Sequence, residues 1–102
     1  MEVKNIDEAD VWFAVLQTHK KTQTAVMTLE PGKSSGEKPE AHKNSEQVLI
    51  VLEGEIFAEI AQESGTLKKN DVVVIPAGVA HKFTNKSKAR VVTFNTYSPP
   101  EY

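Results

Sequence analysis

Residues 47–60, with the sequence QVLIVLEGEIFAEI, contain two consecutive strand patterns that meet at Gly54. The first part, 47–53, is a continuous apolar run, whereas apolar and polar residues alternate over 55–62. A period of two is typical of a strand with one buried face, because successive side chains point to opposite sides. An uninterrupted apolar run is typical of a strand that is covered on both faces. This stretch therefore predicts two adjacent β-strands.

The rest of the chain has the same organisation of short strands separated by turn residues. We predict further strands over 11–18, 22–30, 66–67, 71–75, 81–84 and 90–97. The sequences Glu30-Pro31-Gly32 and Pro76-Ala77-Gly78 end two of them, and Ser64-Gly65 is predicted to be a tight turn. A helix is expected only as a short turn near the N-terminus, where Asn5 or Asp7 could cap it. The pattern predicts one all-β domain over the whole chain, a sandwich or a barrel.

The composition excludes several classes of function. The chain has 102 residues, no cysteine and a formal net charge of −2 at pH 7. Without cysteine there is no disulfide framework, thiolate zinc site, iron–sulfur cluster or cysteine nucleophile. The charge gives no reason to expect nucleic acid as a partner, and no stretch has the length needed to span a membrane. The acidic segment 1–10 lacks the pattern of a secretion signal, so we expect a cytoplasmic protein.

The apolar run at 48–52 also bears on assembly. If Leu49 and Val51 face the barrel interior, the other three residues of this run face outward and need a second cover. That cover could be another sheet of the same chain or a partner subunit. Because Trp12 and Phe13 add further apolar surface, we expect a homodimer.

Two of the three histidines lie at the ends of predicted strands, where ligand sites of barrels form. His42 stands between a polar loop and a strand, and His81 directly follows a turn. Neutral imidazole is the commonest metal ligand in proteins, and the oxygens of Glu40 and Gln47 could complete the coordination shell of a metal ion. His19 is expected to be an exposed turn residue. Spacing alone leaves open that His42 and His81 are ordinary surface or hydrogen-bonded residues.

In the segment 70–85, Pro76, Gly78, His81 and Asn85 follow one another at a spacing that resembles the second of the two sequence motifs of the cupin family. That motif reads Gly, five residues, Pro-x-Gly, two residues, His, three residues, Asn. Four of its positions are in register in this chain: Pro76, Gly78, His81 and Asn85. Asn70 stands in place of the leading Gly, and Asn also tolerates the left-handed conformation that Gly would serve.

The segment 36–54 resembles the first cupin motif less completely. That motif reads Gly, five residues, His-x-His, three or four residues, Glu, six residues, Gly. Gly54 matches its end, and Gln47 stands where the glutamate ligand is expected. The resemblance as a whole covers roughly residues 31–97.

Two registers remain open for the histidines of the first motif. If His42 is the second histidine, Glu40 replaces the first, and we prefer this register because a carboxylate ligates strongly. If His42 is the first, Gly36 fits the leading Gly and Asn44 replaces the second histidine. The resemblance therefore implies a ligand set of Glu40 (or Asn44), His42, Gln47 and His81.

The resemblance implies a jelly-roll barrel, also called a double-stranded β-helix, with a small organic molecule as its partner. Cupins bind iron, manganese, nickel, zinc or copper, so a divalent metal ion is the expected cofactor. We expect either a metal-dependent enzyme of the dioxygenase, isomerase or lyase type, or a non-catalytic protein that binds or senses a small molecule or metal. Gln47 in place of a glutamate removes a negative charge and weakens a dication site, which favours the second alternative.

Overall fold

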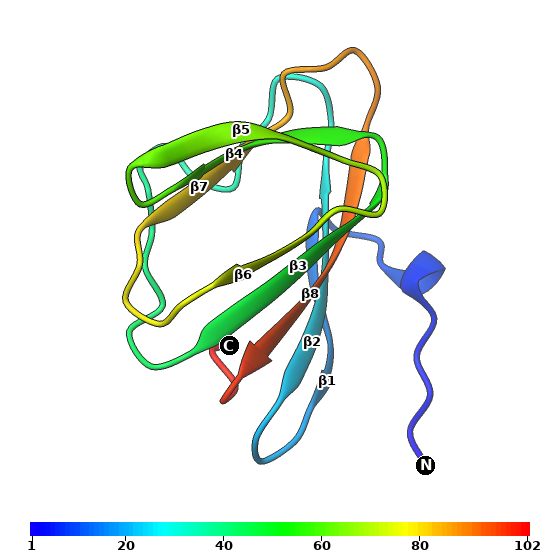
Figure 1. The fold of residues 1–102 in the computed structure, drawn as a ribbon. Helices are drawn as coiled ribbons and strands as arrows, with labels where there is room; N and C mark the ends of the chain where they lie inside the picture. The colour runs from blue at the N-terminus through cyan, green and yellow to red at the C-terminus, as the bar shows by residue number, and fades with distance from the viewer.

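A computed structural model describes residues 1–102, which form eight β-strands and one short helix, and so confirms the predicted all-β class. The strands lie in two antiparallel sheets that face each other as the two halves of a jelly-roll barrel (Figure 1). One sheet has the strand order β1-β2-β8-β3-β6 and the other the order β5-β4-β7. No helix is long and apolar enough to cross a membrane.

The predicted strands are all present, although their ends shift by a few residues. Their bounds are β1 Phe13–Thr18, β2 Gln23–Leu29, β3 Glu46–Glu53, β4 Glu55–Ile60, β5 Glu63–Lys68, β6 Val72–Ile75, β7 His81–Thr84 and β8 Val91–Ser98. The 3₁₀ helix η1 covers Ile6–Glu8. Asn5 caps it as expected, because its side-chain oxygen accepts a hydrogen bond from the backbone N–H of Asp7.

The predicted tight turn at Ser64-Gly65 is wrong. Both residues lie inside β5 and pair with β4. The hairpin turns at Ala61-Gln62 instead, and Ile60 pairs with Glu63 on either side of it. Ala61 adopts a φ of +56°, a conformation that favours glycine. The nearest glycine was therefore a misleading signal for the position of this turn.

The core lies between the two sheets and is built from alternate residues of each strand. Leu49 and Val51 of β3 are fully buried, as predicted, and pack with Ile56 of β4 and Phe83 of β7. Toward the start of β3 the interior becomes polar. There the inward-facing residues of neighbouring strands include Gln23, Gln47, Asn95 and Tyr97.

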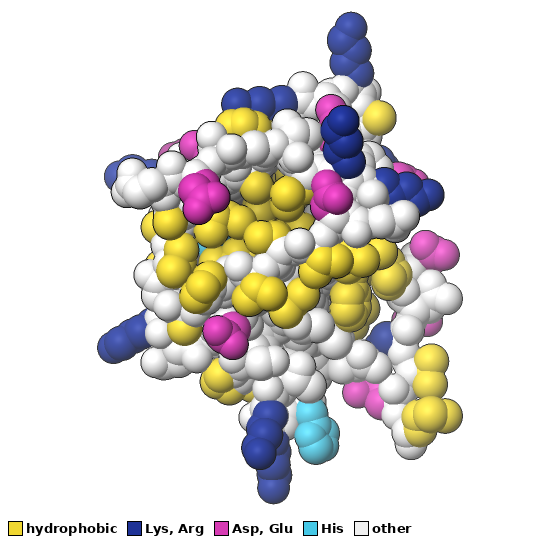
Figure 2. Space-filling view, viewed as in Figure 1, with side chains coloured by type: hydrophobic (Ala, Val, Ile, Leu, Met, Phe, Trp, Pro, Cys, Tyr) yellow, Lys and Arg dark blue, Asp and Glu magenta, His cyan; other side chains and the backbone are white.

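The barrel is open along one side. The edge strands β5 and β6 belong to different sheets and do not pair with each other. Figure 2 shows hydrophobic side chains exposed in this opening, which is lined by residues including Ile60, Leu67, Val73 and Val79. The opening is a cleft of about 450 Å³.

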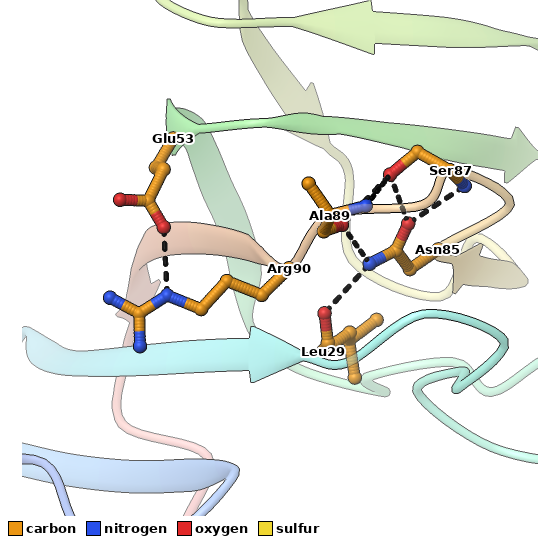
Figure 3. Close-up of polar contacts among 6 residues, drawn as sticks. All are labelled: Leu29, Glu53, Asn85, Ser87, Ala89 and Arg90. Carbon is orange, nitrogen blue, oxygen red and sulfur yellow. Dashed lines mark hydrogen bonds and ion pairs between the residues drawn. The ribbon is translucent and has the colours of Figure 1, made fainter.

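Asn85, the last residue of the second motif, closes the loop that follows β7. Its Nδ2 donates to the carbonyl oxygens of Leu29 and Ala89, both at 2.8 Å (Figure 3). Its Oδ1 accepts from the backbone N–H and the hydroxyl of Ser87. Because both polar atoms of this fully buried side chain are satisfied, Asn85 has a structural role that fixes the β7–β8 loop against the end of β2.

Gly54 makes the connection between β3 and β4, with a φ of +78°. A Cβ atom at this position would lie 2.5 Å from the carbonyl oxygen of Arg90. The nearby ion pair between Arg90 Nε and Glu53 Oε2 is 2.8 Å long (Figure 3). Its side chains are 57% and 54% exposed, so it contributes little to stability. The backbone contact at Gly54, rather than the ion pair, constrains this corner.

We expect Gly54→Ala to lower the free energy of unfolding by about 2 kcal/mol or more, because it combines a strained positive φ with a backbone clash. Gly65→Ala is the matched control, since no atom lies within 4 Å of its added Cβ and its φ is not positive. Urea denaturation measures both variants. Equal midpoints for the two would contradict the constraint at Gly54.

Candidate functional site

A pocket of about 270 Å³ lies inside the polar part of the barrel, and all four predicted ligand residues line it. Its other lining residues are Trp12, Phe13, Met27, Ser35, Phe83, Tyr97 and Tyr102. None of the lining side chains is Lys or Arg. The pocket therefore combines histidine, amide and carboxylate groups with an aromatic wall and has no cationic side chain of fixed charge.

Backbone hydrogen bonds bring the two motif segments together. Glu40 and His81 form an antiparallel bridge, with N–H to carbonyl distances of 2.9 and 2.8 Å. The N–H of Gly78 donates to the carbonyl oxygen of His42 at 2.7 Å, so the turn before β7 also holds this segment. Residues opposite each other in an antiparallel pair share one face, and the residue two positions further along shares it too. This pairing explains why Glu40, His42 and His81 all face the pocket.

The two imidazole rings lie side by side, with centroids 4.8 Å apart, and both are buried. His81 Nδ1 lies 3.0 Å from the carbonyl oxygen of Val79, and a carbonyl can only accept, so Nδ1 carries the proton. Burial lowers the pKa of His81, against the opposing effect of this hydrogen bond, and His42 lowers it further. His81 is therefore neutral at pH 7 and keeps a lone pair on Nε2. His42 Nδ1 lies 3.3 Å from Glu101 Oε1.

Gln47 supplies an unpaired acceptor in the same pocket. It is 3% exposed, and its Nε2 donates to Asn95 Oδ1 at 2.9 Å. Its Oε1 is buried and has no hydrogen-bond partner within the protein. A buried acceptor left unpaired costs about 1–3 kcal/mol, which a bound cation or donor group would recover. Gln47 lines the same pocket as the two imidazoles, and its unpaired oxygen fits a metal ion or a hydrogen-bond donor.

The two alternatives for the remaining ligand lie in different surroundings. Glu40 lines the pocket, whereas Asn44 is exposed outside it. The Glu40 carboxylate packs against Gly36, since a Cβ on Gly36 would lie 3.1 Å from Oε1. No three His, Asp or Glu side chains converge closely enough to form a metal-binding group. The pocket thus brings two histidines and the Gln47 amide together, with one carboxylate beside them.

Two tyrosines of the pocket were not assigned a role from the sequence. Tyr97 continues the alternation of β8, in which Val91, Thr93 and Asn95 also face inward, and this pattern could have placed it. Tyr102 follows a proline pair that breaks any periodic pattern, so no such signal exists for it. Burial raises the pKa of both phenols, and they are protonated at neutral pH. Both can therefore donate a hydrogen bond.

Buried Gln23 holds the C-terminal segment 99–102 against the pocket. Its Oε1 accepts from the N–H groups of Glu101 and Tyr102, at 3.1 and 2.9 Å, and its Nε2 donates to the Tyr102 carbonyl oxygen at 2.7 Å. Ser45 Oγ donates to the Pro99 carbonyl oxygen at 2.6 Å. These bonds make the segment a fixed wall of the pocket.

The ring of Tyr102 completes this wall. Its centroid lies 4.8 Å from that of Phe13, 5.1 Å from that of Tyr97 and 5.9 Å from that of His42. Edge-to-face and tilted arrangements at these distances are favourable for aromatic pairs. The wall therefore places an aromatic surface directly beside the histidines.

The chain belongs to the cupin family, because the sequence model that defines the cupin domain family matches residues 25–97. An uncharacterized protein of Streptomyces coelicolor is 31% identical over 83 residues, which are 80% of this chain and 74% of that protein. A crystal structure from Bacillus halodurans has a TM-score of 0.89 at 22% identity and covers 100% of this chain and 83% of its own. A sugar phosphate isomerase of the cupin superfamily from Silicibacter pomeroyi has a TM-score of 0.69 at 22% identity, over 76% of this chain and 50% of its own. The structural similarities establish the fold.

We expect Gln23→Leu to release the C-terminal segment, because the substitution removes three hydrogen bonds to residues 101 and 102. Amide order parameters of these residues, measured by ¹⁵N relaxation, should fall from about 0.85 to below about 0.6. Gln62→Leu, at an exposed turn position, is the control and should leave them unchanged. Rigid amides at 101 and 102 in Gln23→Leu would show that other contacts hold the wall.

Proposed function

We propose that this cupin binds a divalent metal ion through His42 and His81 and a small organic molecule beside it. The observation that carries the proposal is the pair of adjacent buried imidazoles with the unpaired Gln47 Oε1 in the same pocket. Metal-binding histidines usually place their other ring nitrogen against a carbonyl or carboxylate oxygen. Val79 and Glu101 supply such oxygens here.

The remaining donors support an open site with room for a ligand. Gln47 would bind through Oε1, and Glu40 is the further ligand in the preferred register because it lines the pocket. A metal held here would supply a Lewis acid for an oxygen group of the ligand. The chain itself would orient the ligand against Phe13 and Tyr102, and its protonated phenols could donate hydrogen bonds.

The cupin fold hosts dioxygenases, isomerases and lyases, so the fold does not decide which reaction, if any, this chain catalyses. The charge of the pocket gives information about the ligand instead. The structural relative from Silicibacter pomeroyi is a sugar phosphate isomerase. In this chain no Lys or Arg lines the pocket, so a phosphate group would meet no fixed positive charge from the protein. In the pocket without a bound metal ion, this favours uncharged or cationic small molecules over sugar phosphates.

A non-catalytic binding or sensing protein is the second candidate. It is favoured by Gln47 at the position of the expected acid and by the absence of three converging His, Asp or Glu side chains. In that case the Nε2 atoms of the histidines and the Gln47 oxygen would accept hydrogen bonds from the ligand directly.

Metal binding can be tested on protein purified without a metal-affinity tag and soaked in iron, manganese, nickel or zinc. We expect bound metal by mass spectrometry, and we expect His81→Ala to weaken binding by at least about tenfold while the barrel stays folded. His19→Ala, at an exposed position, is the control and should bind as the natural chain does. Protein that stays metal-free after soaking would refute metal binding and leave the non-catalytic binding protein as the remaining candidate.

We also propose that the protein forms a homodimer through the outer face of its five-stranded sheet. Cross-strand pairing aligns Phe94, Ile50 and Val72 on this face, with Val48 and Val74 in the next row. Val72 and Val74 are 58% and 53% exposed, and both lie on the edge strand β6, beside the apolar cleft to β5. An exposed apolar patch of this kind suits a two-fold dimer.

We expect Val72→Asp combined with Val74→Asp to convert this dimer to a monomer, because the charges would be buried in the interface. Both positions are exposed in one chain, so the barrel should stay folded. Val11→Asp is the matched control, because Val11 is 56% exposed and lies outside this sheet. Sedimentation velocity at micromolar concentration measures the result, and a monomeric natural chain would rule out the dimer.

A further inference from the structure

A chain of buried hydrogen bonds connects the barrel wall to Gln47. Thr93 Oγ1 donates to the carbonyl oxygen of Met27 at 3.1 Å, and Asn95 Nδ2 donates to Thr93 Oγ1 at 3.0 Å. Gln47 Nε2 donates to Asn95 Oδ1 at 2.9 Å. Thr93 and Asn95 are fully buried and Gln47 nearly so, so water does not compete for these bonds. We refer to Thr93, Asn95 and Gln47 as the relay.

The relay has a fixed direction because it ends on a backbone carbonyl. The Met27 oxygen can only accept, so the Thr93 hydroxyl donates its proton to it and accepts from Asn95. This turns Asn95 Oδ1 toward Gln47, and the Gln47 amide must then present Nε2 to Asn95. A side-chain amide without such constraints could adopt either orientation. Gln47 lines the pocket, and the relay therefore leaves its oxygen, rather than its nitrogen, without a partner.

We propose that Asn95 and Thr93 are positioning residues that make Gln47 Oε1 a fixed acceptor, so that the pocket selects a cation or a hydrogen-bond donor. This inference rests on the proposed function, because it takes the barrel pocket as the binding site. It adds the chemistry of the ligand: a divalent cation, or the hydroxyl or amino group of an uncharged or cationic small molecule. Without a metal ion between them, an anionic group at this position would bring its oxygens against the Gln47 oxygen.

The charges around the pocket agree with this selectivity. Glu40 lines it, the Glu101 carboxylate lies 3.3 Å from His42 Nδ1, and no lining residue is Lys or Arg. Burying a carboxylate or phosphate without a cationic partner is costly, and more so beside other carboxylates. The relay and the surrounding charges thus favour the same class of ligand.

Two substitutions at Asn95 separate positioning from simple packing. Asn95→Leu removes the acceptor for Gln47 Nε2, so the amide can turn, and Zn²⁺ affinity should fall by about tenfold or more. Asn95→Asp, which burial keeps protonated, retains an oxygen that accepts from Gln47 Nε2 and a hydroxyl that donates to Thr93 Oγ1, so Zn²⁺ affinity should be retained. Titration calorimetry with Zn²⁺ alone measures both, with Gln62→Leu at an exposed turn position as the control. Equal losses in the two Asn95 variants, or no loss in Asn95→Leu, would overturn the proposal.

A double-mutant cycle with Gln47→Leu tests whether Asn95 acts through Gln47. If it does, Asn95→Leu should cause no further loss of Zn²⁺ affinity once Gln47 has been replaced. Additive losses in the double variant would mean that Asn95 affects the site by another route, and would overturn the assignment.

The relay can also be tested without metal, which distinguishes its failure from that of the proposed function. Slow hydrogen exchange of the Gln47 side-chain amide, measured by NMR, is expected in the natural chain and in Asn95→Asp but not in Asn95→Leu. If Asn95→Leu does not fold, Thr93→Val should speed this exchange and Thr93→Ser should restore it. If the natural chain binds no Zn²⁺, the exchange rates of the Gln47 side-chain amide alone decide whether the relay fixes its orientation. Fast exchange in the natural chain would refute it.

Discussion

The backbone pairing between residues 40–42 and the start of β7 is the interaction on which the site depends. The bridge between Glu40 and His81 and the bond from Gly78 to His42 join two segments that are far apart in the sequence. Because pairing fixes the direction of side chains as well as the backbone, it places both histidines in one pocket. His81 is thus held by strand β7 and His42 by backbone hydrogen bonds at and next to it, which position the two side chains more firmly than a free loop would.

Local patterns predicted the fold well where neighbouring residues decide the structure. The two strands of residues 47–60 follow from their periodicity, and Asn70 does adopt a left-handed φ of +75° in place of glycine. The error at Ser64-Gly65 has a different cause. The true turn places Ala61 at a positive φ, and its N–H donates to the carbonyl oxygen of Ala80, which is distant in the sequence but lies beside the neighbouring strand β7. A tertiary contact of this kind leaves no local signal.

The same distinction applies to the site. His42 and His81 could be placed because motif spacing and strand ends are local features, and strand parity brought Glu40 to the same side. The wall formed by Glu101 and Tyr102 could not be predicted. Its position depends on Gln23, which accepts hydrogen bonds from the N–H groups of both residues. Gln23 lies 78 residues before Glu101 and 79 residues before Tyr102 in the sequence.

The replacement of an acid by Gln47 changes the energetics of the pocket. A buried carboxylate needs a cation beside it, whereas a neutral amide leaves one unpaired oxygen, at a cost of about 1–3 kcal/mol. A domain with a typical stability of about 5–15 kcal/mol can tolerate that cost without a ligand. Because a ligand that pairs with this oxygen binds only the folded chain, occupancy of the pocket and stability of the barrel are linked. The relay through Asn95 makes that link specific, since it leaves the oxygen and not the nitrogen of Gln47 unpaired.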